Sequence, residues 1–170
     1  VIKDVEHKAG IETAEPGAYK VTGNTVVYAE FAKDTNGNGK PDYKEETYNV
    51  NFVAGENGKL EGTTLYKDYL SGTAINSAEG YKEPKAVADE GYAFDKWIVR
   101  DVNHPEGIEI NDPSTYIIHS NTVFYASFEE DQHGSDSTDP EQPDNVPDKY
   151  QAEVSFAAVN GTVSFNKTYV

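Results

Sequence analysis

The chain of 170 residues contains no cysteine. It can therefore form no disulfide framework, and it offers no thiolate for a structural zinc site. It also contains no run of about 18 apolar residues, the length that a helix needs to cross a bilayer. We therefore expect neither a cysteine-based metal centre nor insertion into a membrane.

Positive charge is scarce. The chain has 14 Lys and Arg residues against 30 Asp and Glu residues, which gives a formal net charge of −16. Such a field repels the phosphates of nucleic acids and anionic membrane surfaces, and it attracts cations. The same charge also serves solubility. We therefore expect no nucleic-acid partner, whereas a cation such as Ca2+ fits the charge.

Sequence motifs of several enzyme classes are also missing. The chain has no Walker loop, HExxH pair, nucleophile elbow or dinucleotide-binding glycine pattern. Acidic residues are so frequent that two carboxylates near each other in the sequence do not indicate glycosidase chemistry. We therefore expect a protein that is not an enzyme.

An internal repeat is the clearest feature that is present. Residues 1–34 align without a gap on residues 98–131, with 15 identities in 34 positions, where chance gives roughly 2. The other part of the pattern also recurs, because Asn49–Ala54 resembles Glu153–Ala158 and an Asn-Gly pair follows each of them. The sequence therefore predicts tandem copies of one module.

The repeat predicts how the chain is divided. The parts are the C-terminal half of a repeat (1–33), a joint (34–46), one complete module (47–128), an acidic Pro-rich linker (129–149) and the start of a third repeat (150–170). We expect the linker to be extended by charge repulsion and by its prolines. The pattern is already under way at the first residue and unfinished at the last, so we expect a segment of a longer protein.

Most of the chain is predicted to form strands, because Tyr, Val, Thr and Phe favour them. Tyr48–Ala54 alternates apolar and polar residues, and the Asn-Gly pair after it is typical of a hairpin turn. Leu60–Leu65 is therefore expected to return beside it. Tyr116–Ile118 and Thr122–Phe128 are expected to form an antiparallel pair. The predicted class is β-rich α+β with mainly antiparallel strands.

The stretch Asp34–Glu45 has the ligand spacing of an EF-hand-type calcium loop. Gly39 stands at the sixth position, where such a loop turns sharply. The expected ligands are the side chains at positions 1, 3, 5, 9 and 12 and the backbone carbonyl at position 7: Asp34, Asn36, Asn38, Lys40, Asp42 and Glu45.

Two features set this loop apart from a calcium sensor. Pro41 stands where an EF-hand loop forms a small strand pair, and the residues after the loop alternate as a strand and not as a helix. We therefore expect a weak Ca2+ site, with a Kd of about 10⁻⁴–10⁻³ M, that fixes a joint between modules. The alternative is a polar turn that binds no ion.

A second joint precedes the third repeat. Aligning the Pro-Asp pair at 147–148 on the pair at 41–42 places Pro140 at the first ligand position and Gln151 at the twelfth. Neither residue offers a carboxylate. We therefore expect no specific ion site in this joint.

Two histidines fall on equivalent positions of the repeat. His7 and His104 each have an Asp three residues before and a Glu five residues after. This pattern is either a catalytic or metal-binding constellation or a loop that was copied with the repeat, and we favour the copied loop.

Trp97, the only Trp, lies in the densest aromatic stretch. We expect it to anchor the core. The alternative is an exposed aromatic side chain that stacks on a sugar.

Three stretches, Asn51–Gly62, Ala86–Trp97 and Asn121–Phe128, resemble the InlB B-repeat (Listeria–Bacteroides repeat) module. The Gly-Tyr-x-Phe-Asp-x-Trp element that ends at Trp97 is fairly specific for it. The joints resemble the short calcium-type linkers between such repeats. Extra residues at Val102–Asp112 depart from the usual pattern.

The resemblance implies tandem small β-grasp-like modules in an extracellular, wall-attached protein of a Gram-positive cell. It carries over no catalytic residue. Repetition, the acidic linker, the absence of a reactive cluster and the metal joint fit a spacer that holds a distal binding domain away from the wall, with adjacent repeats of the same chain as its partners. The alternative is an adhesive module that binds a host protein or glycan through exposed tyrosines and the stretch 102–112.

Overall fold

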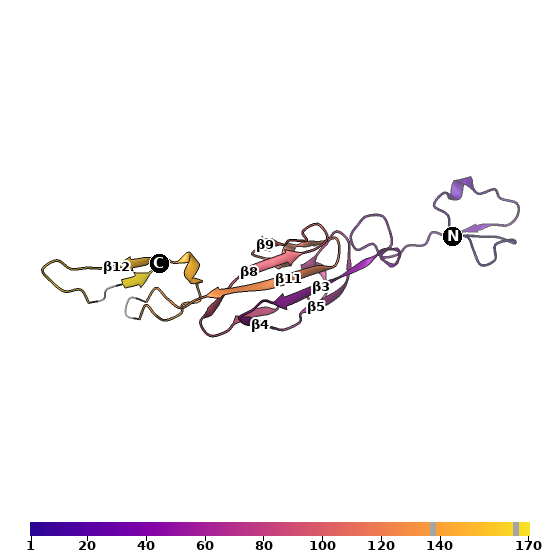
Figure 1. Cartoon of the computed structure of the whole chain (residues 1–170). Coiled ribbons are helices and arrows are strands. Elements are labelled where there is room, and N and C mark those ends of the chain that lie inside the picture. Colours follow the sequence, from indigo (N-terminus) through magenta and orange to yellow (C-terminus); the bar gives the residue numbers. More distant parts are fainter. Residues whose placement is uncertain (137–138, 165–166) are drawn as a thin grey trace. The chain divides into compact units, whose positions relative to one another are not determined.

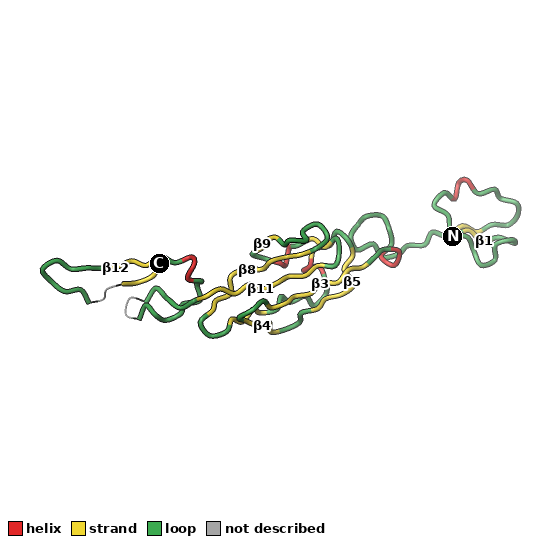
Figure 2. Tube along the Cα trace, viewed as in Figure 1, coloured by secondary structure: helices red, strands yellow, loops and turns green. Residues whose placement is uncertain are grey.

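The computed structural model describes residues 1–136, 139–164 and 167–170, and the chain divides into two compact units, 1–44 and 45–170 (Figure 1). Loops make up most of the first unit and strands dominate the second, and the helices described in these ranges are 3₁₀ turns of three residues (Figure 2). They are η1 (Pro16–Ala18), η2 (Asp42–Lys44), η3 (Ile75–Ser77), η4 (Pro113–Thr115) and η5 (Asp148–Tyr150). Within the same ranges, no helix is long and apolar enough to cross a membrane.

The first unit is built around one short strand pair. Strand β1 (Ile2–Lys3) pairs antiparallel with β2 (Val26–Val27), and Ile2 also bridges to Ile11. Ile2 is fully buried, whereas both residues of β2 are exposed. The unit therefore has a very small core, as expected for so few residues.

The second unit contains a five-stranded sheet with the order β5-β3-β11-β8-β9. Its strands are β3 (Thr47–Ala54), β5 (Leu65–Leu70), β8 (Tyr92–Arg100), β9 (Ile108–Ile110) and β11 (Thr122–Glu130). Strands β3 and β11 run parallel, and the other neighbours run antiparallel. The prediction of a β-rich fold with mainly antiparallel strands is confirmed.

Three small two-stranded sheets complete the second unit. Strand β4 (Gly58–Glu61) pairs with β7 (Lys85–Ala88), and β6 (Thr73–Ala74) pairs with β10 (Ile117–Ile118). Near the C-terminus, β12 (Glu153–Ser155) pairs with β13 (Lys167–Tyr169). All three pairs are antiparallel.

The structure corrects two predicted strand pairings. Asn57 does adopt the positive φ (66°) of the predicted turn, but β4 leaves that turn to pair with β7, and β3 pairs with β5 instead. Likewise β10 pairs with β6, so it is not the antiparallel partner of β11. For β4, packing accounts for the partner, because Leu60 lies opposite Ala86 and both pack on the core.

The core of the second unit is aromatic and centres on Phe52. Its ring stacks on Phe124 at 5.0 Å and meets Trp97 edge-on at 5.2 Å. Trp97 is 2% exposed, and its indole N–H donates to Glu83 Oε1 at 3.1 Å. The prediction that Trp97 anchors the core is therefore confirmed. At one edge of this core Gly58 lies under the ring of Phe128, where a Cβ atom would come within 2.4 Å of a ring carbon.

Phe128 and Phe31 occupy equivalent positions of the repeat, but Phe128 is 8% exposed and Phe31 is 96% exposed. We expect Phe128→Ala to lower the free energy of unfolding of the second unit by about 3 kcal/mol, because it leaves a cavity beside Phe94. Chemical denaturation followed by Trp97 fluorescence measures this loss. Phe31→Ala is the matched control and should leave the Trp97 transition unchanged. Equal effects of the two variants would contradict this packing.

Candidate functional site

Residues 97 positions apart make the same backbone contacts in the two units. Strand β2 pairs with β1 in the register in which β11 pairs with β8. The bridge between Ile2 and Ile11 recurs as the pair Val99 and Ile108. The turn η1 recurs as η4. The first unit therefore reproduces the part of the second unit that is formed by β8, β9 and β11.

A buried carboxylate organises the loop after β8. The side chain of Asp101 is 1% exposed, and its Oδ1 accepts the backbone N–H groups of Asn103 at 2.9 Å and His104 at 2.8 Å. Nδ1 of His104 lies 3.0 Å from the same oxygen. The Tyr116 hydroxyl donates to Asp101 Oδ2 at 2.7 Å. One carboxylate therefore ties the loop to the residues that precede β10.

The protonation of Asp101 follows from these contacts. Burial alone would raise its pKa, but the hydrogen bonds from Tyr116 and from the backbone and ring of His104 outweigh burial and lower the pKa. Conversely, burial and the nearby carboxylate raise the pKa of Tyr116, so its hydroxyl remains a donor. The cluster is therefore an ionised carboxylate that accepts hydrogen bonds from the Tyr116 hydroxyl and from the backbone of the loop.

The first unit repeats this cluster with Asp4, His7 and Tyr19. Asp4 Oδ1 accepts the backbone N–H of His7 at 2.7 Å, and Tyr19 donates to Asp4 Oδ2. The Tyr19 hydrogen bond is the main reason that the pKa of Asp4 falls to about 2. The same three residue types thus fix the same loop twice. This agrees with the interpretation of a loop copied with the repeat.

The predicted calcium loop lies at the end of the first unit. Both Asp34 oxygens accept backbone N–H groups, from Asn38 at 3.1 Å and from Gly39 at 2.9 Å. The side-chain oxygen of Asn36 accepts from the N–H of Asn38 as well, at 3.2 Å. Gly39 has a φ of 82°, which suits glycine at the sharp turn. Three of the predicted ligand residues, Asp34, Asn36 and Asn38, are therefore drawn to one turn of the backbone.

The remaining predicted ligands are placed as follows. Asp42 accepts the backbone N–H of Thr35 at 2.7 Å and its hydroxyl at 2.6 Å, and these bonds lower the pKa of Asp42. Asp42 is thereby held beside the residue that follows Asp34. Lys40 is exposed, and its N–H donates to Asn38 Oδ1 at 2.8 Å. Glu45 is the half-buried first residue of the second unit.

The second joint contains the same turn with an insertion. Asp131 is 1% exposed and accepts the backbone N–H groups of Asp144 at 3.2 Å and Asn145 at 2.8 Å, as Asp34 does with Asn38 and Gly39. Asn145 has a φ of 67°, close to that of Gly39. In the same way Asp148 accepts the N–H of Gln132 at 3.1 Å, which matches the bond from Thr35 to Asp42.

The alignment of the two joints, which placed Pro140 at the first ligand position, is therefore wrong. Asp131, and not Pro140, takes the role of Asp34, because thirteen positions separate Asp131 from Asp144 where four separate Asp34 from Asn38. The repeat offset of 97 already places Asp34 on Asp131 and was the signal that could have found it. Gln151 donates its amide to Asp144 at 3.0 Å. Asp131, Asp144 and Asp148 thus accept hydrogen bonds within this linker. Charge repulsion alone, which we expected to extend the linker, does not account for these contacts.

Oxygen atoms dominate the first loop, and hard oxygen donors suit Ca2+ better than softer metals. The two carboxylates of the first unit's loop are supplemented by amide and carbonyl oxygens. Across residues 1–136, 139–164 and 167–170, no three His, Asp, Glu or Cys side chains gather so that they could hold a metal ion.

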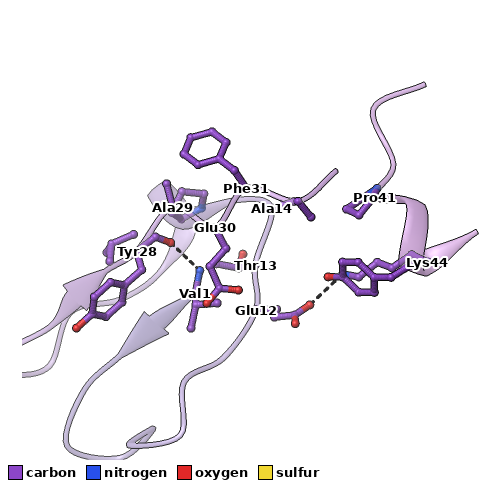
Figure 3. Close-up of a pocket in the computed structure, with 14 residues that line it drawn as sticks. Val1, Glu12, Thr13, Ala14, Tyr28, Ala29, Glu30, Phe31, Pro41 and Lys44 are labelled. Carbon is purple, nitrogen blue, oxygen red and sulfur yellow. Dashed lines mark hydrogen bonds and ion pairs between the residues drawn. The ribbon is translucent and has the colours of Figure 1, made fainter. Parts of the chain in front are cut away.

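The first unit also carries an open pocket of about 870 Å³ (Figure 3). Tyr28, Ala29 and Phe31 line one side of it, together with Glu12, which forms an ion pair with Lys44 at 3.2 Å. The N-terminal amine of Val1 donates to the carbonyl of Tyr28 at 2.9 Å and so extends the β1–β2 ladder. Two of the lining residues, Ala29 and Phe31, have equivalents in the second unit, Ala126 and Phe128, that are buried in the core.

Comparison with known proteins identifies one family. The family model described as a divergent InlB B-repeat domain matches residues 48–132. No curated protein and no solved structure matches the chain. The matched stretch begins at the second residue of β3 and ends just after β11, so it covers all five strands of the sheet except Thr47.

The contacts of Asp101 predict that its contribution to the free energy of unfolding depends on pH. Asp101→Asn should lower the free energy of unfolding by about 2–3 kcal/mol at neutral pH, because buried N–H donors lose their charged acceptor. The folded-state pKa of Asp101 lies below the unfolded value of about 3.9. Its contribution is therefore full above that value, and the difference between variant and wild type should shrink as the pH falls through the folded-state pKa.

Urea denaturation at a series of pH values measures this difference. Glu106→Gln, an exposed carboxylate in the same loop, is the control and should be neutral throughout. An Asp101→Asn penalty that stays constant from neutral pH to well below the unfolded pKa would show that the charge of the carboxylate plays no part.

Proposed function

The chain belongs to the divergent InlB B-repeat domain family, and we propose on this basis that it is a spacer that withstands tension in a bacterial surface protein. Members of this family are associated with bacterial surface proteins. In this proposal the chain lies outside the cell, attached to the wall of a Gram-positive bacterium, and holds a distal domain away from the wall. Adjacent repeats of the same chain are its partners.

One observation carries the spacer proposal: the first and last strands of the matched module are parallel neighbours. Val50 lies beside Thr122, Phe52 beside Phe124 and Ala54 beside Ala126. Tension applied at the two ends of the module pulls β3 and β11 in opposite directions along their length. The evenly spaced hydrogen bonds of a parallel pair then share the load instead of breaking one at a time. A spacer under external force needs this property.

Tandem β-grasp-like modules are part of the same proposal. The contacts repeated at an offset of 97 support a second module of the same kind before residue 45. The parallel pairing of the first and last strands of a small mixed sheet supports the β-grasp-like description.

Adhesion to a host protein or glycan is the alternative function. Exposed tyrosines favour it, since Tyr43 is 71% exposed and Tyr150 is 60% exposed. Against it, Trp97, the strongest candidate for stacking on a sugar, lies in the core. Part of the extra stretch 102–112 is also taken up by β9, which pairs with β8. The spacer therefore accounts for more of the structure.

We also propose that the loop 34–45 binds Ca2+ weakly. The hard oxygen donors of Asp34, Asn36, Asn38 and Asp42, with the Lys40 carbonyl and Glu45, suit this ion. Hydrogen bonds to the backbone already order the first three side chains, so less ordering remains for the ion to impose. Bound Ca2+ would stiffen the joint and would not expose a groove for a partner.

Single-molecule pulling tests the spacer. Because the chain has no cysteine, handles can be attached at introduced cysteines. Handles at positions 47 and 130 load β3 and β11 in shear, and we expect one discrete unfolding event that releases roughly 3.5 Å per residue of the module. Handles at 47 and 71 pull on the end of the β3–β5 ladder, where Thr47 lies opposite Leu70, and should open it at a several-fold lower force.

The same fold is pulled in both experiments, so a difference in unfolding force reports only the direction in which the strands are loaded. If the shear geometry unfolds at a force no higher than the peeling geometry, the module is not built to bear load along the chain. The spacer proposal then loses the observation that carries it.

A titration tests the calcium proposal. We expect CaCl2 to shift the amide NMR signals of Gly37 and Gly39 with a Kd of about 10⁻⁴–10⁻³ M. Asp34→Ala should abolish this response, whereas Glu30→Ala, an exposed acid in the same unit, should retain it. Signals that do not move at Ca2+ concentrations about tenfold above this range would eliminate the site.

A further inference from the structure

The Gly-Tyr-x-Phe-Asp-x-Trp element at residues 91–97 contains a buried carboxylate that the core does not use. Asp95 lies in β8, and the residues on either side of it lie opposite Phe128 and Ser127, which are themselves consecutive. Asp95 is therefore an extra residue with no partner on β11, which makes it a β-bulge. A bulge re-aims side chains, so Asp95 need not follow Trp97 into the core as regular alternation would require.

The carboxylate of Asp95 is held by the turn η5, which follows the acidic linker. Its side chain is 0% exposed, Lys149 Nζ lies 2.8 Å from its Oδ2, and the Tyr150 hydroxyl donates to its Oδ1 at 2.8 Å. Lys96 of β8 lies farther from Oδ2, at 3.4 Å. Lys149 also pairs with Glu129 of β11 at 3.0 Å. The two closest donors to this buried charge therefore come from the far side of the linker.

The protonation of Asp95 depends on these partners. Burial alone would raise its pKa, but the hydrogen bonds from Lys149 and Tyr150, together with the charges of Lys149 and Lys96, outweigh burial and lower the pKa. A pair of exposed charges contributes little to stability, whereas a buried charge that loses its partner is costly. The contact between β8 and η5 is therefore more than an incidental surface ion pair.

Gly91, the first residue of the element, receives the near side of the linker. Its carbonyl accepts the backbone N–H of Asp131 at 2.9 Å and the side-chain amide of Gln132 at 2.8 Å. Gly91 has a φ of 78°, and a Cβ atom there would come within 2.5 Å of Gln132 Nε2. Glycine is thus required both by the backbone conformation and by the close approach of the linker.

The two contact points are also tied to each other. Asp148, the first residue of η5, accepts the backbone N–H groups of Gln132 and His133, each at 3.1 Å. Gly91 therefore binds one side of the linker, Asp95 binds the other, and Asp148 closes the linker between them. An extended chain that is kept open by charge repulsion would make none of these contacts.

We propose that Gly91 and Asp95 form a docking site through which the module holds its own second joint, defined here as residues 131–151. The site recognises a lysine ammonium and a tyrosine hydroxyl that directly follow a Pro-Asp pair, both bound to one buried carboxylate. The docked joint moves with the five-stranded sheet, so β12 leaves the module in a fixed direction.

This inference goes beyond the spacer proposal, because it concerns the stiffness of one joint and applies equally to a module that adheres. It also assigns the two joints different means of stiffening. In the first joint the proposed agent is a bound ion, whereas in the second joint it is a contact with the preceding sheet.

Backbone ¹⁵N relaxation of the full chain tests the proposal. It measures the order parameter S² of each amide, which is about 0.85 in rigid backbone and below about 0.6 in flexible backbone. In the wild-type chain we expect the amides of residues 149–151 to have S² values close to those of β8. Asp95→Asn keeps the shape of the side chain but removes its charge, and should lower these values to below about 0.6. Glu90→Gln, an exposed carboxylate beside Gly91, is the control and should leave them unchanged.

Two variants on the linker side keep the test valid if Asp95→Asn disturbs the sheet. Lys149→Ala and Tyr150→Phe lie outside the sheet, and unchanged amide shifts of β3 and β11 verify that the module is intact. Each should lower S² at residues 149–151. Asp95→Asn combined with Lys149→Ala should lower it no further than the stronger single variant, because both remove the same ion pair.

Two outcomes overturn the proposal. One is a wild-type chain in which the amides of residues 149–151 already have S² below about 0.6, because the joint is then not docked. The other is an S² that stays near the value of β8 in either Asp95→Asn or Lys149→Ala.

Discussion

The parallel pairing of β3 with β11 is the interaction on which the rest of the second unit depends. These strands lie next to each other in the middle of the sheet, although some 70 residues separate them in the sequence. Their contact brings Phe52 onto Phe124, and Trp97 then packs against Phe52 from β8. The backbone N–H of Gly55 extends the ladder by donating to the carbonyl of Ala126 at 2.8 Å. The proposed mechanical role follows from this one pair.

Buried carboxylates solve a second problem, which is how to order long polar loops beside so small a core. The side chain of Asp101 is 1% exposed, and so is the whole of Asp131. Each carboxylate accepts hydrogen bonds from two backbone N–H groups. A charged acceptor makes stronger hydrogen bonds than a neutral one. Several donors around a buried carboxylate therefore offset much of its desolvation penalty. Part of the strongly acidic composition is therefore structural and does not serve solubility alone.

The sequence was informative wherever the relevant signal was local or periodic. Alternation predicted β3, the single Trp was placed correctly in the core, and the offset of 97 relates residues that make the same contacts. It failed where the partner of a segment is chosen by distant packing. The Asn-Gly turn at 57–58 has the expected backbone, but nothing nearby in the sequence specifies that β4 joins β7. An insertion of nine residues likewise hid the role of Asp131, because the alignment of the joints allowed no gap.

Amide hydrogen exchange of the native chain tests the central claim most directly, since it reports the free energy at which each backbone hydrogen bond opens. If the β3–β11 pair closes the module, the amides of β11 and the Gly55 amide, which donates to the carbonyl of Ala126, should exchange among the slowest. Both strands should open at the free energy of global unfolding that Trp97 fluorescence reports. Protection of β8 and β11 alone, with β3 exchanging at a much lower free energy, would contradict this account.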